Sequence, residues 1–190
     1  MKRYNVVIRI VVVLLAGMMV LALPASAGAL PAEGGPGVRL LQSDGQGIVL
    51  ELSTSDYELK EDVVKGMACQ RIRVPGYAQS EEPGRPQLPL GVVLLGVPPQ
   101  AELELEITPL QTTRLPETLR ICPAPEAVAE HDEDGFVRYV TRERALDLAV
   151  YGEDRYYPSK VVRLDDLGFL RGQRIVRLAI SPFQVNPLSG

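Results

Sequence analysis

Ala101-Glu102-Leu103-Glu104-Leu105-Glu106-Ile107 alternates between apolar and acidic side chains without a break. Neighbouring side chains of a β-strand point to opposite faces, so this stretch predicts a strand with one face on a core and one in water. A helix would scatter the three glutamates around its circumference. We expect the glutamate row to be solvated and to deter edge-to-edge pairing, because no further oxygen ligands are arranged for calcium.

Short apolar runs separated by turn signals continue on both sides of this stretch. Residues 38–41 and 48–52 flank Asp44-Gly45, which predicts a hairpin, because Asp-Gly suits a turn with positive φ. Residues 90–97 form a more continuous run, for which we expect cover on both faces. Further strands are predicted at 70–74, 160–164 and 173–180, with a turn at 165–168.

The region 109–135 contains Pro109, Pro116, Pro123 and Pro125, which oppose a long strand or helix. We expect an extended connection over the surface there, with Cys122 inside it. Residues 141–148 could form one short helix capped by Thr141. About seven or eight short strands result, which predicts an all-β fold, an antiparallel β-sandwich with at most one short helix.

Composition restricts the function classes. The chain has 190 residues, 46% hydrophobic and 23% charged, which fits one globular domain. It has one histidine, two cysteines and no tryptophan, too few convergent groups for most catalytic or metal sites. We therefore expect no enzyme, no cofactor and no metal in these residues.

The first 27 residues have the pattern of a Sec-type signal peptide. Lys2, Arg3 and Arg9 precede an apolar run from Val11 to Leu23, and Ala25-Ser26-Ala27 supplies a small-residue cleavage site. We expect cleavage after Ala27; the alternative is an uncleaved anchor, for which the run is short.

Cleavage would place the chain outside the cell or on its surface, without a membrane partner. Residues 28–37 then form a flexible leader rich in glycine. Three basic residues leave with residues 1–27, so the formal net charge falls from −4 to −7, which argues against nucleic acid as a partner.

Cys69 and Cys122 leave two readings open. Export would let a disulfide persist, but the sequence does not show whether the two residues lie close enough, and buried free thiols fit as well. A catalytic pair with His131 is disfavoured, because His131 lies in Glu130-His131-Asp132-Glu133-Asp134-Gly135, which reads as a solvated acidic turn.

Five motifs occur in an order that resembles the N-terminal propeptide domain of gingipain-type cysteine peptidases, over roughly residues 38 to 190. They are Gly84-Arg85-Pro86-Gln87-Leu88-Pro89, Val97-Pro98-Pro99, Tyr156-Tyr157-Pro158, Arg171-Gly172-Gln173-Arg174 and Pro182-Phe183-Gln184-Val185-Asn186-Pro187. At Val185 the family more often has tyrosine.

The resemblance implies a noncatalytic β-sandwich propeptide at residues 38–190 that assists folding of a downstream cysteine peptidase domain and keeps it latent. It also implies that the family pattern continues beyond Gly190, so that this domain is truncated at its C-terminus. The catalytic residues would lie in the later domain. An adhesion or carbohydrate-binding sandwich is the alternative, although seven Tyr, three Phe and no Trp are few aromatics for a sugar site.

Because such peptidases prefer basic residues at the scissile bond, the resemblance implies a tethered inhibitor that offers an arginine to an acidic pocket. Arg142 and Arg144 are the candidates in the long insertion, and Arg85 is a rival, since an Arg-Pro bond resists cleavage. The competing interpretation is that these are solvated surface arginines, whose charges commonly contribute little.

Overall fold

The structure is a computed structural model that describes residues 1–13, 37–44, 47–54, 56–115 and 118–190. These residues form thirteen β-strands and one helical turn, α1 (Leu148–Tyr151). The strands are β1 (Lys2–Val13), β2 (Val38–Asp44), β3 (Gly47–Leu52), β4 (Glu58–Val64), β5 (Met67–Arg73), β6 (Ala78–Gln79), β7 (Pro89–Val97), β8 (Glu102–Arg114), β9 (Glu126–His131), β10 (Val137–Arg142), β11 (Val162–Leu170), β12 (Gln173–Ile180) and β13 (Phe183–Gln184). The strands pair antiparallel in several sheets, which confirms the predicted all-β class with one short helix.

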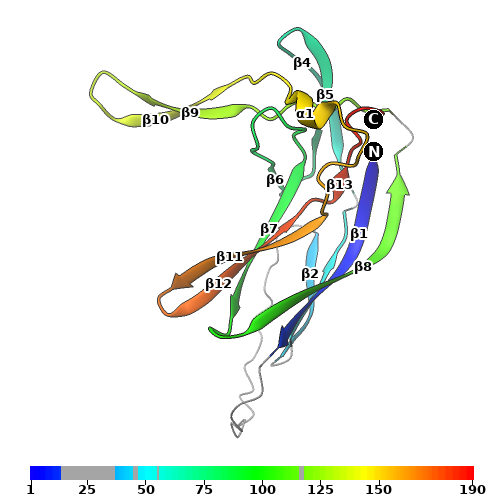
Figure 1. Ribbon diagram of the computed structural model, residues 1–190, viewed down its shortest axis with the longest axis vertical. Coiled ribbons are helices and arrows are strands. Elements are labelled where there is room, and N and C mark those ends of the chain that lie inside the picture. Colours follow the sequence, from blue (N-terminus) through cyan, green and yellow to red (C-terminus); the bar gives the residue numbers. More distant parts are fainter. Residues whose placement is uncertain (14–36, 45–46, 55, 116–117) are drawn as a thin grey trace, which may run out of the picture.

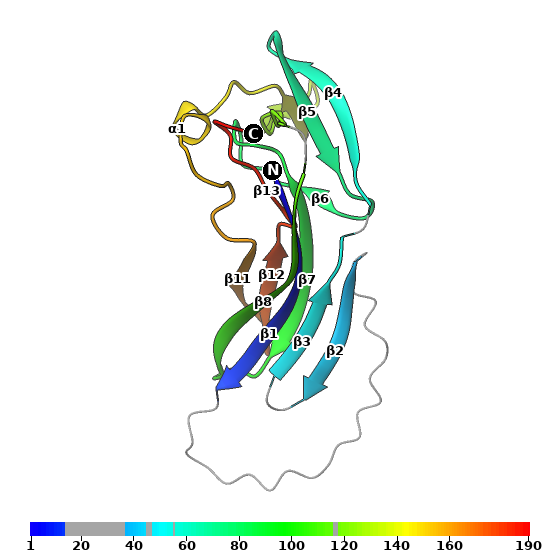
Figure 2. The same cartoon turned by 90° about the vertical axis from the view of Figure 1, so that its right-hand side faces the viewer.

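Two sheets make the body of the molecule (Figures 1 and 2). In the larger one, β1 pairs with β8 on one side and with β3 and β13 on the other, and β2 pairs with β3. The smaller sheet has the order β11-β12-β7-β6. Ile8 and Ile10 of the first sheet share a buried cluster with Leu178 and Ile180 of the second, so apolar contacts hold the sheets together.

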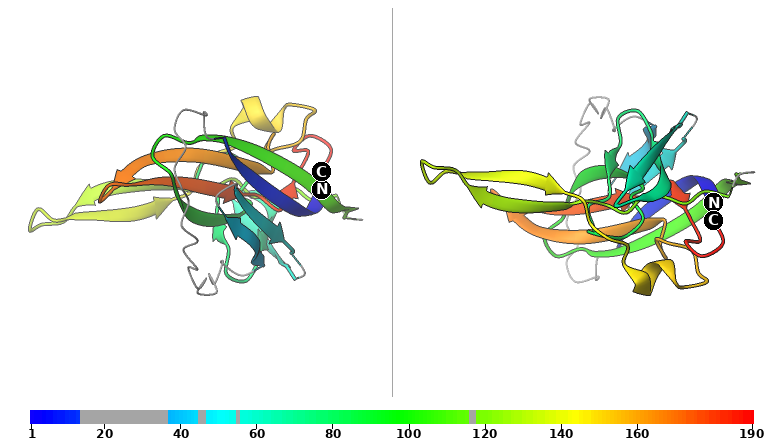
Figure 3. Two further views of the ribbon diagram at one scale, coloured as in Figure 1. Left: turned by 90° about the horizontal axis from the view of Figure 1, so that it is seen from below. Right: turned by 90° about the horizontal axis from the view of Figure 1, so that it is seen from above.

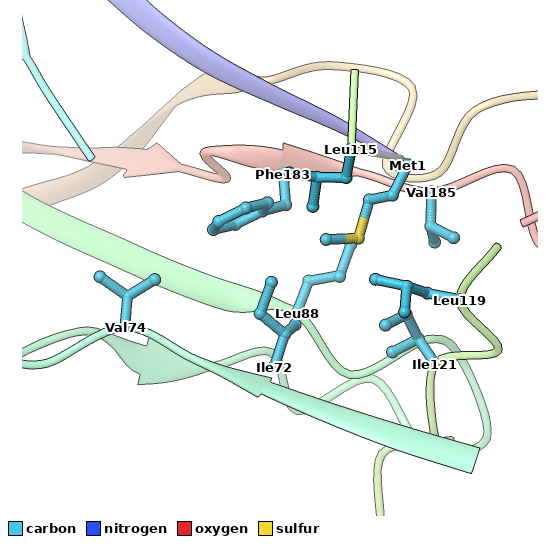
Figure 4. Packing of buried hydrophobic residues seen from close by; sticks show 9 residues of the cluster. All are labelled: Met1, Ile72, Val74, Leu88, Leu115, Leu119, Ile121, Phe183 and Val185. Atoms are coloured by element: carbon cyan, nitrogen blue, oxygen red, sulfur yellow. The ribbon is translucent and has the colours of Figure 1, made fainter. Parts of the chain in front are cut away.

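A second core lies at the end of the body where the chain begins. Phe183, Leu88 and Ile72 surround the side chain of Met1 there (Figure 4). Tyr57 packs edge-on against Phe183, with ring centroids 5.7 Å apart. Two two-stranded hairpins, β4-β5 and β9-β10, extend beyond the two main sheets.

The prediction of an extended connection over 109–135 is wrong for much of its length. Strand β8 continues through Pro109 to Arg114, and β9 occupies Glu126–His131. Pro109 is accommodated because the register with β1 shifts between Asn5 and Val6, next to the pairing of Val6 with Pro109. A proline is tolerated at such an irregularity, where the regular ladder of hydrogen bonds is interrupted.

The predicted helix at 141–148 is also largely wrong. Strand β10 runs to Arg142, because Thr141 pairs with Ala127 across the hairpin. The helical turn begins only at Leu148, where the Asp147 Oδ1 accepts the N–H of Ala149 at 3.1 Å. Tertiary pairing therefore overrides a local preference for helix.

Two details of the smaller sheet differ from expectation. The predicted turn at 165–168 lies inside β11, which has a register shift between Asp166 and Gly168. The chain reverses only after Leu170, at Arg171 and Gly172, whose φ angles are 50° and 82°. Val92 and Leu94 of β7 are exposed, so the prediction of cover on both faces is wrong for these described residues.

The N-terminal residues take part in the fold as described, since Lys2–Val13 form β1. Ala27 and residues 28–36 lie outside the described residues, so the signal peptide and the leader remain predictions. Among the helical residues that the structure describes, none belongs to a helix long and apolar enough to span a membrane.

Tyr151, which is buried, and Tyr157, which is half-buried, make the stability of the fold depend on pH in the alkaline range. Burial raises the pKa of Tyr151, whose hydroxyl donates to the Ile121 carbonyl oxygen at 2.7 Å, and raises the pKa of Tyr157 to about 12. An unfolded tyrosine ionises near pH 10, so this stabilisation is complete below about pH 10 and is lost as the pH rises through the folded-state values.

We therefore expect the urea midpoint to be flat between about pH 8 and pH 9.5 and to fall above about pH 10. The variant Tyr151→Phe loses a hydrogen bond worth about 1 kcal/mol at pH 8 but should show a smaller alkaline decline. An identical decline in both proteins would contradict this assignment.

Candidate functional site

The hairpin β9-β10 projects from the body as an arm (Figures 1 and 3). Its turn closes on Asp132, whose Oδ1 accepts the N–H groups of Asp134 at 3.1 Å and Phe136 at 2.8 Å. Gly135 permits this turn with φ +84°. The solvated acidic turn predicted at residues 130–135 is thus the tip of an arm, and its backbone geometry makes the tip a defined structure.

One face of the arm carries a ladder of ion pairs. Glu130 binds Arg142 at 2.5 Å and Arg138 at 3.5 Å, and Glu126 binds Arg144 at 3.2 Å. The hydrogen bond from Arg142 holds the pKa of Glu130 below its usual range. These exposed pairs orient the arginines and contribute little to stability.

The other face of the arm carries apolar side chains that are open to solvent. Tyr139 is 76% exposed and Phe136 at the tip is 71% exposed, and Val137 beside them is exposed too. Exposed aromatic side chains on a projecting hairpin are typical of a contact surface for another protein. Sequence reasoning missed these three residues, although their position just after the acidic turn was a usable signal.

The base of the arm is tied to the body by a disulfide and by backbone hydrogen bonds. Cys69 on β5 is bonded to Cys122, with the sulfurs 2.09 Å and the Cα atoms 5.0 Å apart. The Cys122 carbonyl accepts the N–H of Gln87 at 2.9 Å, and the N–H of Ala124 donates to the Arg85 carbonyl at 2.8 Å. The described residues contain no free thiol, which leaves no nucleophile for a pair with His131.

The structure places two of the three predicted arginines together at this base. Arg85 pairs with Glu82 and lies 3.4 Å from Asp147, while Arg144 packs beside Gly84. Arg142 lies farther out, on the arm itself. The side chains of Arg142, Arg144 and Arg85 are 61%, 56% and 43% exposed, so each is accessible to a partner.

A shallow hollow of about 440 Å³ opens at the same base. Its walls come from Pro83 and Gly84 on one side, from Glu143 through Asp147 on the other, and from Lys65 at the β4-β5 turn. Glu143 accepts the N–H of Lys65 at 3.4 Å, which connects this hairpin to the base of the arm. The candidate site therefore consists of the arm with its arginines and of a base formed by residues 83–84, residues 143–147 and Lys65.

Gly84 is expected to be required for this arrangement. Gly84→Ala would place a Cβ 2.8 Å from the Ala145 carbonyl oxygen at φ +79°, whereas the matched variant Gly135→Ala has φ +84° and meets nothing within 4 Å. We expect losses of about 2–3 kcal/mol for the first and about 1 kcal/mol for the second in urea unfolding. Equal losses would mean that the close approach at Gly84 has no energetic weight.

Residues 30–190 match the family model Propeptide_C25. The chain belongs to the Propeptide_C25 family. This finding confirms the resemblance to gingipain propeptides, and the matched residues correspond to a propeptide domain and not to a catalytic domain.

Two curated relatives, both called Gingipain R1, come from Porphyromonas gingivalis and from its strain ATCC 33277. Each is 26% identical to this chain over 159 residues, which is 81% of the chain. The match spans only 15% and 9% of the relatives' own lengths.

Two solved structures share the fold of this Propeptide_C25 domain. One, on the zymogenic latency of gingipain K from P. gingivalis, has a TM-score of 0.54 at 18% identity and covers 84% of this chain and 86% of that one. The other, a complex of the RgpB pro- and mature domains of P. gingivalis, has a TM-score of 0.64 at 18% identity, with coverages of 81% and 77%. At this identity the likeness concerns the fold alone.

Proposed function

We propose that this Propeptide_C25 domain is the noncatalytic propeptide of a gingipain-like cysteine endopeptidase, which it helps to fold and keeps latent. The observation that carries the proposal is the arm, which presents exposed arginines and aromatics and whose base is anchored by a disulfide. A solved structure with the same fold is a complex of the pro- and mature domains of RgpB from P. gingivalis, which supports a peptidase domain as the partner.

In this proposal an arginine of the arm or its base enters the peptidase cleft. A peptidase that prefers basic residues offers carboxylates there, and an arginine can bind a carboxylate through two parallel hydrogen bonds. Arg142, Arg144 and Arg85 are the candidates, and each would exchange its present acidic partner for one in the cleft. The exposed Phe136 and Tyr139 would supply apolar contact from the tip and the opposite face of the arm.

We further propose that the precursor is exported by its N-terminal segment, with cleavage after Ala27, and acts outside the cell or on its surface. The motif of charged start, apolar run and small residues supports this.

An inhibition titration tests the latency function. The purified chain is added to a gingipain-type peptidase, alongside the variants Arg142→Ala, Arg144→Ala and Arg85→Ala. We expect saturable inhibition and a rise in the inhibition constant of about 10- to 100-fold for the arginine that enters the cleft, because a charge-assisted hydrogen bond is lost.

Arg39→Ala is the matched control, because Arg39 is an exposed, ion-paired arginine on β2, in the larger sheet of the body. It should inhibit like the unmodified chain. If the folded chain does not bind the peptidase, the latency function is wrong, and an adhesion or carbohydrate-binding module becomes the better explanation.

A further inference from the structure

Strand β7 of the smaller sheet has an open edge over most of its length. On one side it pairs with β12 over residues 91–97, whereas on the other side β6 pairs only with residues 89–90 (Figure 1). Among the described residues, no backbone hydrogen bond reaches residues 92–96 from that second side. The edge ends at Pro98, which has no N–H to continue it.

The backbone groups that face this edge can be identified from the alternation along the strand. The Leu88 carbonyl oxygen accepts the N–H of Ser80, which follows β6, at 2.8 Å. Successive residues of a strand direct their backbone groups to opposite sides, so those of Val92, Leu94 and Gly96 face the same side as Leu88. The main-chain donors and acceptors at these three positions are therefore available to another strand.

The other long edge strands of the two main sheets carry features that discourage pairing. Strand β8 has its row of exposed glutamates, and β2 and β11 each contain charged residues and a register shift. Natural sheets use charges and bulges of this kind to prevent pairing between molecules. Strand β7, by contrast, has no charged residue between Leu88 and Pro99, and its register with β12 is regular. Its edge is therefore unprotected.

A second copy of the chain fits this edge. If the two β7 strands pair antiparallel about a twofold axis, with Leu94 opposite the partner's Leu94, Val92 faces the partner's Gly96. All three positions direct their backbone groups to the edge, so this register lets both strands complete their hydrogen bonds. On the outer face of the sheet, where Val92 and Leu94 are 45% and 62% exposed, each valine would have room beside a glycine.

The charges near the edge also suit a second copy. In a symmetric antiparallel pair, residues near the axis face their own copies, so a charge there would meet its like. Strand β7 carries no charge, and Arg177, which stands opposite Leu94 on β12, is paired with Asp165 at 2.8 Å. The exposed valine and leucine side chains of both copies would instead form one apolar strip.

We propose that this chain forms a twofold dimer by antiparallel pairing of β7 with β7 of a second copy, which joins the smaller sheets of the two molecules into one. The contact uses a short edge and few side chains, so we expect a weak dimer with a dissociation constant of about 10–100 µM. It shares no residue with the arm and does not depend on the latency function.

Sedimentation velocity of the full chain between about 1 and about 300 µM tests the proposal. We expect the monomer to give way to a dimer over this range. Leu94→Lys should raise the dissociation constant at least about tenfold, because two ammonium groups would face each other near the axis. Leu170→Lys is the matched control and should leave the constant unchanged, since Leu170 lies on β11 of the same sheet and is 65% exposed. Both leucines are exposed, so neither lysine disturbs the core.

The variant Leu94→Cys tests the register. Facing Cα atoms of a hydrogen-bonded antiparallel pair lie about 5.5 Å apart, which is within the range of a disulfide. The oxidised variant should therefore form a covalent dimer, whereas Leu170→Cys should not. A chain that stays monomeric at the highest concentration, a dimer that Leu94→Lys leaves intact, or a Leu94→Cys variant that cross-links no better than Leu170→Cys would each overturn the proposal.

Discussion

Replacing both cysteines, as Cys69→Ala/Cys122→Ala, is expected to lower the free energy of unfolding by about 4 kcal/mol. The disulfide joins residues separated by 53 positions, and closing a loop of that length removes about this much conformational freedom from the unfolded chain. Urea unfolding followed by circular dichroism would measure the loss.

Reductant supplies the control for this prediction. The unmodified chain should fall to the level of the double variant when it is reduced, while the variant should not respond. Equal midpoints for the oxidised chain and the variant would show that the bond adds no stability.

The same substitution should loosen the candidate site. Cys122 is part of the backbone network that holds Arg85 and the start of the arm against β5. We expect faster amide exchange at residues 84–87 and 121–124 in the variant, and weaker inhibition of a peptidase even where most of the chain remains folded. The disulfide thus connects stability to function, because it fixes the root of the arm.

The second large effect is expected for Phe183→Ala, with a loss of about 3–5 kcal/mol. Phe183 is 0% exposed and packs among Met1, Ile72 and Leu88, whereas Phe169 on β11 is 63% exposed. The substitution leaves a cavity in the core and removes the contact with the ring of Tyr57. Phe169→Ala, the matched control, should change stability by no more than about 0.5 kcal/mol.

Tyrosine fluorescence can follow both variants, since the chain has no tryptophan. A loss at Phe183 as small as that at Phe169 would mean that the core around Met1 is not formed in solution. Because Met1 belongs to that core, the result also bears on whether β1 occupies its position in the sheet.

Parts of the fold could be predicted because their signal is local. The alternation of leucine and glutamate at 102–106 predicts one strand, and the Asp-Gly turn after residue 43 predicts a hairpin; both are present as β8 and β2-β3. In the strand, the alternation of neighbouring side chains indicates which face meets water. In the hairpin, the Asp-Gly pair indicates where the chain reverses.

Other parts depend on partners far away in the chain. Pro109 is compatible with a strand only because the facing β1 shifts its register there, and Thr141 belongs to a strand only because Ala127 pairs with it. The residues near Pro109 and Thr141 in the sequence do not indicate which distant strand will pair with them. The prediction of a loop and of a helix failed at these positions for this reason.

The candidate site also has features that the sequence predicts and features that only the tertiary structure shows. Residue type and motif order identified the propeptide family and three arginines, because those features are written in short stretches of the chain. The closeness of Arg85 to Arg144, the bond between Cys69 and Cys122, and the exposure of Tyr139 on a projecting arm arise only when segments about 50 or more residues apart are packed together or left uncovered. Such long-range contacts follow from burying apolar surface across the whole molecule, and no local period in a sequence encodes them.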